Sequence, residues 1–251
     1  MVLEARGIWK SFDGVQVLRD AWIEVEQGQI VGLIGPNGAG KSTFLAVLSK
    51  FITPDHGRIV FQQHDISRTP PDKLARMGMS RTFQVPREFG ELTVLENLLV
   101  AAKSQAGESI WNAWFRFGLV SQQEKELSAQ ARNILQFLKL DAMSDLPAKR
   151  LSGGQKKLLE LGRILMLEPQ LLLLDEPFAG VNPALIDQLI EQLLELRRRG
   201  LTLLVVEHNM YAINALSDVV YVMVDGSILT RNEPQEIRKD ARVLEAYLGS
   251  Y

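Results

Sequence analysis

The chain has 251 residues, 46% of them hydrophobic, and its 28 Lys and Arg residues are nearly balanced by 30 Asp and Glu residues. This length provides enough core for one large domain with a subdomain, and a net charge of −2 gives no basic field that would attract nucleic acid. The absence of cysteine excludes a disulfide scaffold and thiolate metal sites. We expect no signal peptide and no membrane span, because no apolar run approaches the roughly 20 residues that a bilayer requires.

The first 50 residues predict strands followed by a helix. Residues 1–28 alternate between apolar and polar side chains and contain a turn signal at Asp13-Gly14, which predicts antiparallel strands. Residues 30–34 form a short branched apolar run, typical of a buried parallel strand, and a helical pattern runs from Thr43 to Leu48. The segment between this strand and this helix is therefore a strand-to-helix turn.

That turn is rich in glycine and carries a lysine and a serine at its end. Its residues are Gly35, Pro36, Asn37, Gly38, Ala39, Gly40, Lys41 and Ser42. Glycines allow backbone N–H groups to converge on a phosphate at the helix N-terminus, Lys41 would reach the β- and γ-phosphates, and the Ser42 hydroxyl would bind Mg²⁺. An ordinary glycine turn is the alternative that this loop alone leaves open.

A helical segment is predicted from about Val85 to Lys149. Thr93 can cap a helix whose apolar residues follow at helical spacing. Further along, Trp111, Trp114 and Phe115 would share one helix face. We favour packing within a subdomain over a partner-binding surface for these aromatic residues, because such stripes usually form core.

The sequence Leu-Ser-Gly-Gly-Gln at residues 151–155 precedes another helical pattern, from Lys156 to Met166. It predicts a second anion cradle at a helix N-terminus. The alternative is an N-cap serine followed by a flexible glycine pair. Average composition gives these five fixed letters in fewer than about one chain in a thousand, which favours the anion site.

An apolar run from Leu171 to Leu174 ends in two carboxylates, Asp175 and Glu176. A buried strand with a charged end is the simpler interpretation. In a nucleotide site, a strand beside the loop strand would bring Asp175 to the magnesium shell and Glu176 to a water in line with the γ-phosphate. Glu176 would then act as general base, while Lys41, Mg²⁺ and loop amides neutralise the developing charge.

The last part of the chain predicts a helix from Pro183 and strands at residues 201–206 and 219–224. Asp225-Gly226 predicts a hairpin turn after the second of these strands. The three arginines at residues 197–199 are interpreted as a solvated helix end, where cations suit the helix dipole.

Five features stand together in this order: the loop at residues 35–43, Gln84, the sequence at residues 151–155, Asp175-Glu176-Pro177, and His208. Together they resemble the ATP-binding cassette of ABC-type transporters, and the resemblance covers nearly the whole chain. It implies an α/β fold: a P-loop NTPase core with a mixed, mainly parallel sheet, an N-terminal antiparallel β-subdomain and an inserted α-helical signature subdomain. One domain, 1–251, would comprise the β-subdomain and nucleotide-binding core at 1–84 and 168–251, and the helical subdomain at 85–167.

The resemblance also implies ATP and Mg²⁺ as ligands and a head-to-tail dimer, in which the nucleotide bound by one copy is capped by the other. The catalytic residues it implies are Glu176, His208 facing the γ-phosphate, Gln84 sensing the metal and the water, and Lys41. The metal ligands it implies are Ser42, Gln84 and Asp175. The nucleotide-binding residues it implies are Phe12, which would stack on adenine, Gly35, Asn37, Gly38, Ala39, Gly40, Lys41, Ser42, Thr43, Ser152, Gly153, Gly154 and Gln155.

One position departs from the family pattern. The family commonly has an aspartate across the dimer interface where this chain has Asn182, which keeps hydrogen-bonding capacity but lacks the charge. The Ala-Gly-Val-Asn-Pro sequence at residues 179–183 and the tail at residues 243–249 resemble cassettes of importers for branched-chain amino acids, amides and urea.

The resemblance therefore implies an ATP-hydrolysing subunit held at the cytoplasmic face of the membrane by transmembrane permease subunits. Its other partners would be a second cassette, identical or homologous, and, indirectly, a solute-binding protein, with no nucleic acid. Two alternatives are a soluble ABC-type ATPase acting on ribosomes or DNA, and the motor of a lipid or lipopolysaccharide exporter.

Overall fold

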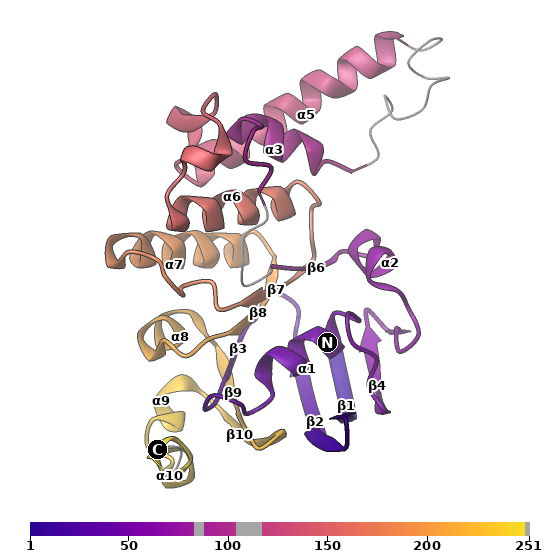
Figure 1. The fold of residues 1–251 in the computed structure, drawn as a ribbon, viewed down its shortest axis with the longest axis vertical. Helices are drawn as coiled ribbons and strands as arrows, with labels where there is room; N and C mark the ends of the chain where they lie inside the picture. Colours follow the sequence, from indigo (N-terminus) through magenta and orange to yellow (C-terminus); the bar gives the residue numbers. More distant parts are fainter. Residues whose placement is uncertain (83–87, 104–116, 249–251) are drawn as a thin grey trace. The chain divides into compact units, whose positions relative to one another are not determined.

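The computed structural model describes residues 1–82, 88–103 and 117–248 (Figure 1). The chain divides into two compact units, and each is described by itself. The first unit comprises residues 1–84, 169–179 and 186–251, and the second comprises residues 85–168 and 180–185. In the described part of the chain, none of the helices has the length and apolarity that a membrane crossing requires.

The first unit contains an antiparallel sheet with strand order β2-β1-β4-β5. Its strands are β1 (Leu3–Phe12), β2 (Val15–Val25), β4 (His56–Phe61) and β5 (His64–Asp65). Asp13 and Gly14 join β1 to β2 with φ angles of 48° and 83°, the positive values that a tight hairpin turn needs. The hairpin predicted from the sequence is confirmed.

The same unit contains a six-stranded sheet with order β10-β9-β3-β8-β7-β6, in which only β10 is antiparallel to its neighbour. Its strands are β3 (Ile30–Ile34), β6 (Met79–Arg81), β7 (Leu171–Asp175), β8 (Thr202–Val206), β9 (Val219–Val224) and β10 (Ser227–Asn232). Every residue of β3, β7 and β8 is buried, as expected for parallel strands covered on both faces. The mixed, mainly parallel sheet predicted from the sequence is confirmed.

The order of the central strands corrects one expectation. The strand that carries Asp175 was expected beside the loop strand, but β8 lies between β3 and β7. The apolar runs that form β3, β7 and β8 are too similar to show in the sequence which strand lies beside which. The connections between the strands decide this order. The carboxyl ends of all three strands still lie at one edge of the sheet.

The helices of the first unit cover these sheets. They are α1 (Lys41–Leu48), α2 (Pro71–Arg76), α8 (Met210–Leu216), α9 (Pro234–Ile237) and α10 (Ala241–Leu248), and α7 (Pro183–Arg198) lies mostly in this unit. Helix α1 begins two residues before the predicted start and contacts β2, β7 and β8. One apolar cluster joins the antiparallel sheet, α1 and the six-stranded sheet, and a smaller one joins α8, α9 and α10 to β3 and β9.

The interpretation of residues 197–199 as a solvated helix end is wrong for Arg197. Its Nη2 atom donates to Asp218 Oδ1 at 2.6 Å and its Nε atom donates to the Gly28 carbonyl at 3.2 Å. Asp218 in turn accepts from the Ile30 N–H at 2.8 Å. Arg197 therefore ties the end of α7 to the start of β3.

The second unit is helical, with α3 (Val94–Val100), α5 (Phe117–Phe137), α6 (Gly153–Leu165) and the short 3₁₀ turns η2 (Asp141–Met143) and η3 (Ala148–Arg150). Thr93 caps α3 in a reciprocal capping box with Glu96, which confirms the predicted cap. A Cβ on Gly162 would lie 2.9 Å from Leu138 Cδ1, so α6 packs closely here. Trp111, Trp114 and Phe115 lie outside the described residues.

The Tyr221 hydroxyl provides a test of how the two sheets of the first unit are joined. Tyr221 on β9 is fully buried, accepts from the Glu24 N–H at 3.1 Å and donates to the Glu24 carbonyl at 3.2 Å, and burial raises its pKa. We expect Tyr221→Phe to lower the free energy of unfolding by about 1–2 kcal/mol, because it removes these bonds inside the core. For a chain of this size the unfolding midpoint should fall by about 2–6 °C in a thermal scan.

Tyr211→Phe is the matched control. Its side chain is 60% exposed and its hydroxyl donates to Asp187 at the surface. A smaller loss is expected, because water replaces an exposed hydrogen bond. Equal losses in the two variants would contradict the role assigned to Tyr221.

Candidate functional site

The glycine-rich loop connects β3 to α1, and its backbone leaves no room for side chains at two positions. A Cβ on Gly35 would lie 2.0 Å from the Met223 carbonyl oxygen, and one on Gly40 would lie 2.9 Å from the Val17 carbonyl oxygen. Gly40 is the N-cap of α1, with φ 98°, and no side chain caps that helix. The first N–H groups of α1 therefore face the loop without a side-chain acceptor, which is the arrangement that binds anions.

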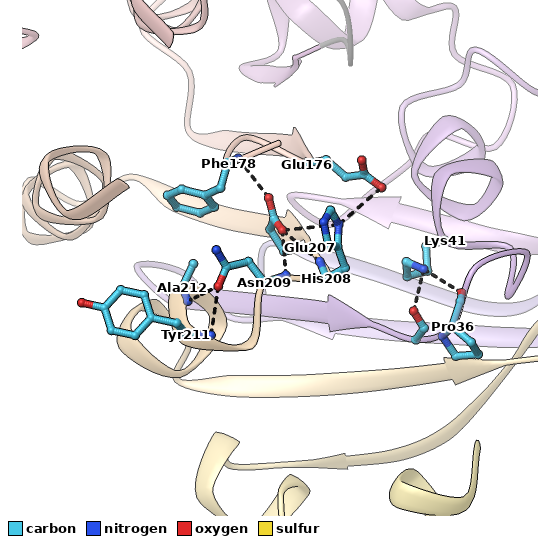
Figure 2. A network of polar contacts seen from close by, with 10 residues as sticks. Pro36, Lys41, Glu176, Phe178, Glu207, His208, Asn209, Tyr211 and Ala212 are labelled. Carbon is cyan, nitrogen blue, oxygen red and sulfur yellow. Dashed lines mark hydrogen bonds and ion pairs between the residues drawn. The ribbon is translucent and has the colours of Figure 1, made fainter. Parts of the chain in front are cut away.

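Lys41 is the first residue of α1, and only 8% of it is exposed. Its ammonium donates to the carbonyls of Gly35 at 2.7 Å and Pro36 at 2.9 Å (Figure 2). Burial lowers the pKa of Lys41, and the nearby carboxylates of Glu176 and Asp175 oppose that shift. Among the described residues, the Lys41 ammonium bonds only neutral carbonyl oxygens, so its positive charge can attract an anion that binds in the loop.

A pocket of about 290 Å³ lies over this loop. It is lined by Val17, Asn37, Gly38, Ala39, Gly40, Lys41, Ser42, Thr43 and Glu176. The structure thus brings Glu176 together with the loop, as predicted. Val17 was missed by the sequence analysis, because only the packing of β2 against the loop places it there.

Phe12 is not among the residues that line this pocket. It ends β1 with 41% of its surface exposed, and the Lys10 ammonium lies 5.3 Å from its ring centroid. An aromatic ring that is partly exposed can stack on a planar group.

Asp175 ends β7, and its two carboxylate oxygens have different surroundings. Oδ2 accepts from Arg81 Nη2 at 2.9 Å, and the side chain is 2% exposed. Oδ1 is buried and has no hydrogen-bond partner among the described residues. A buried acceptor without a partner costs free energy, so this oxygen is suited to bind a cation. Arg81, which the sequence analysis missed, holds the carboxylate through the other oxygen.

Oxygen ligands for Mg²⁺ are therefore present in the chain. Together with the exposed Ser42 hydroxyl on α1, Asp175 Oδ1 matches the hard oxygen donors that Mg²⁺ prefers. No group of three or more acids and histidines that could hold a metal occurs in the described ranges. Gln84, the third predicted ligand, lies outside the described residues.

Glu176 follows Asp175 in a backbone conformation that is rare for its type. Its φ is 49°, and its N–H donates to the Val206 carbonyl at 2.9 Å. Residues other than glycine adopt such angles at a cost of roughly 1–3 kcal/mol, and they gather at functional sites. His208 lies beside it, with Nδ1 4.0 Å from Glu176 Oε1 (Figure 2).

Glu207, between β8 and His208, is a further residue that the sequence analysis missed. Its side chain is completely buried, and its carboxylate accepts hydrogen bonds from three backbone N–H groups of the surrounding loops (Figure 2). An acid after an apolar run was the only available signal, and the same signal identified Glu176. The burial of Glu207 follows from tertiary packing alone.

The sequence at residues 151–155 lies in the second unit. Ser152 is the N-cap of α6 and forms a capping box with Gln155, which confirms the N-cap serine, while the anion cradle stays a prediction. A Cβ on Gly154 would lie 2.9 Å from Leu185 Cδ1, whereas one on Gly153 would meet no described residue within 4 Å. Packing within the chain accounts for glycine at position 154 and not at position 153. Asn182 is exposed in the same unit, and its carbonyl accepts from the Leu185 N–H.

Comparison with known proteins agrees with this geometry. Residues 18–179 match the family model described as ABC transporter. The chain is 41% identical over 249 residues to a probable branched-chain amino acid transport ATP-binding protein, LivG, of Archaeoglobus fulgidus, covering 99% of this chain and 96% of that protein. It is 34% identical over 248 residues to the lipopolysaccharide export system ATP-binding protein LptB of Acidithiobacillus ferridurans, covering 99% and 97%.

A solved structure is also similar over its whole length. It is the crystal structure of the ADP conformation of an ATP-binding cassette of an ABC transporter, with a TM-score of 0.84, 38% identity and 99% coverage of each chain. The family model covers more than half of the chain, and this similarity extends over nearly all of it. The chain belongs to the ABC transporter family.

Proposed function

We propose that this chain is the ATP-hydrolysing subunit of a membrane importer for branched-chain amino acids or a related small amide such as urea. The observation that carries the ATPase part is the pocket in which the glycine-rich loop, Lys41 and Glu176 meet. The identity with LivG supports the solute class. The motor of a lipopolysaccharide exporter is the second candidate. It is supported by the identity with LptB, which is lower than the identity with LivG.

The phosphates of ATP would occupy the pocket over the loop. The N–H groups of residues 38–43 would bind them, and Lys41 would exchange the carbonyls of Gly35 and Pro36 for β- and γ-phosphate oxygens. Phe12, with its exposed ring, would stack on adenine.

The Ser42 hydroxyl and Asp175 Oδ1 would hold Mg²⁺, with Gln84 as a further ligand. The ion, when bound, would neutralise part of the charge on the β- and γ-phosphates. Arg81 would keep Asp175 oriented by holding the oxygen that the metal does not use.

Hydrolysis would use Glu176 as general base. Its carboxylate lines the pocket and would accept a proton from a water in line with the γ-phosphate. Lys41 would stabilise the charge that gathers on the transferred group, and His208 would donate a hydrogen bond to the γ-phosphate.

A second cassette would complete each site in a head-to-tail dimer. Ser152, Gly153, Gly154 and Gln155 of one copy would cap the nucleotide bound by the other. The free space around Gly153 supports this proposal, because no described residue requires a glycine there and a close external ligand would. Asn182 would lie at the same interface, without the charge of an aspartate.

Transmembrane permease subunits would hold the protein at the cytoplasmic face of the membrane, and a solute-binding protein would be an indirect partner. ATP binding would close the cassette dimer and hydrolysis would reopen it, and this movement would drive the permease. The near-neutral net charge gives no reason to expect nucleic acid as a partner.

Glu176→Gln tests the general base. The amide keeps the size of the side chain but cannot accept the proton, so we expect ATP hydrolysis to fall by about 100-fold or more. Nucleotide affinity, measured by calorimetry with ATP and Mg²⁺, should stay within about twofold, because the loop and Lys41 are unchanged. Glu245→Gln, at an exposed position of α10, is the control. Hydrolysis at near the wild-type rate by Glu176→Gln would exclude the assignment.

Mixing two inactive variants tests the composite site. Lys41→Ala removes the phosphate contact, and Gly153→Asp places a carboxylate in the open space where the opposite nucleotide would lie. Each variant alone should be inactive, whereas an equal mixture should recover up to about a quarter of the wild-type rate, because half of the dimers regain one intact site. No recovery from two folded variants would contradict a head-to-tail dimer.

Co-purification tests the transport function. The tagged chain, expressed in its own host and solubilised from membranes in mild detergent, should retain two polytopic membrane proteins in mass spectrometry. Calorimetry with leucine, isoleucine, valine and urea on the associated solute-binding protein would then identify the solute. Recovery of lipopolysaccharide-export components would favour the second candidate, and recovery of ribosomes or DNA-associated factors without a membrane protein would overturn both.

A further inference from the structure

Glu207 is a buried carboxylate whose two oxygens serve two different segments of the chain. Oε1 accepts from the Phe178 N–H at 2.9 Å, in the segment that follows β7. Oε2 accepts from the N–H groups of His208 at 2.9 Å and Asn209 at 3.0 Å, in the segment that follows β8 (Figure 2). The carboxylate therefore bridges the ends of two neighbouring strands.

A buried negative charge is expensive unless hydrogen bonds or a cation compensate it. The Glu207 side chain is completely buried, and in the described part of the chain no lysine or arginine forms an ion pair with it. Three backbone N–H groups supply the compensation instead. A carboxylate can hold the segment after β7 and the segment after β8 at once, because it accepts hydrogen bonds on both oxygens. An amide accepts on only one.

The beginning of α8 does not need this carboxylate. Asn209 caps that helix itself, with Oδ1 accepting from the N–H groups of Tyr211 and Ala212 (Figure 2). The bonds to Glu207 are additional to this cap. The bonds to Glu207 fix the position of residues 208–209 relative to the segment after β7.

Glu176 and His208 are carried by the two bridged segments. Phe178 follows Glu176 by two residues, and the N–H of His208 itself is bound. The His208 Nδ1 atom lies 4.0 Å from Glu176 Oε1 and 3.8 Å from Glu207 Oε2. We propose that Glu207 is a positioning residue that sets the separation between the His208 imidazole and the Glu176 carboxylate. This inference rests on the proposed ATPase function and adds a residue to it.

Glu207→Gln tests the inference. The amide has one acceptor oxygen, so it can serve only one of the two segments, and its NH₂ group faces an N–H of the other. We expect kcat for ATP to fall by about tenfold or more, with KM and nucleotide affinity within about twofold of wild type, because the residue does not touch the phosphate-binding loop.

The position of the imidazole gives an independent readout. The chain has three histidines, so the His208 ring signal in a proton–carbon correlation spectrum can be assigned by its loss in His208→Ala. Glu207→Gln should shift that signal. A role confined to stability would lower the unfolding temperature and leave both the signal and the kcat of the folded protein unchanged.

Asp218→Asn is the matched control. Asp218 also accepts from a backbone N–H, that of Ile30, but at the opposite end of the parallel strands. The same change from carboxylate to amide should lower the unfolding temperature there while kcat and the His208 signal stay unchanged. If Glu207→Gln does not fold, Glu207→Asp replaces it, because its carboxylate is one methylene too short to reach both segments.

An unshifted His208 signal, or a kcat within about twofold of wild type, in the folded Glu207 variant would overturn the inference. A comparable loss of kcat in Asp218→Asn would overturn it too. Wild-type protein without ATPase activity would instead refute the proposed function, so the two failures are distinguishable.

Discussion

The hydrogen-bonded register of β3, β8 and β7 is the constraint on which the site depends. Val206 on β8 is level with Leu33 on one side and with Asp175 on the other. The ladder also continues past the strand ends, because the Glu207 N–H donates to the Leu33 carbonyl and the Glu176 N–H donates to the Val206 carbonyl. The three chain segments therefore leave the sheet side by side. The backbone register therefore brings the Glu176 and Glu207 side chains to the same edge of the sheet.

Charge at this edge is balanced locally and in different ways. Lys41 is held by carbonyl oxygens, Asp175 by a guanidinium on one oxygen only, and Glu207 by backbone N–H groups. All three are buried, so removing the hydrogen-bonding partners of any one of them would destabilise the fold. The Asp175 and Glu207 carboxylates are held in place before a charged ligand arrives, and only Lys41 has to change its hydrogen-bonding partners, so the site is largely preorganised electrostatically.

Local signals in the sequence predicted the local structure well. The hairpin turn at Asp13-Gly14, the Thr93 cap and the buried run at residues 30–34 were all predictable, because each depends on residues close together in the chain. The position of β8 between β3 and β7 was not, since the apolar runs are interchangeable until crossovers order them. Arg197 was misjudged for a related reason, because its partners are distant in sequence.

The candidate site also contains residues that could be predicted from the sequence and residues that could not. The loop at residues 35–42, Asp175 and Glu176 carry patterns that can be recognised without a structure. Arg81 and Val17 carry none, and Glu207 carries only its place after an apolar run, because an arginine, a valine or a glutamate is common on any surface or strand. What distinguishes these three is their surroundings: an ion pair with Asp175, a place on the pocket wall, and complete burial.

The backbone of Glu176 shows a conflict between fold and function. A φ of 49° is strained for glutamate and relaxed for glycine, so the fold alone would be more stable with a different residue at this position. Glu168, at φ 47°, shares this conformation outside the candidate site, so the angle alone does not identify a functional residue. With Glu176 as the proposed general base, this strain belongs to the carboxylate itself, because glycine, the residue that would relieve it, has no side chain to accept a proton.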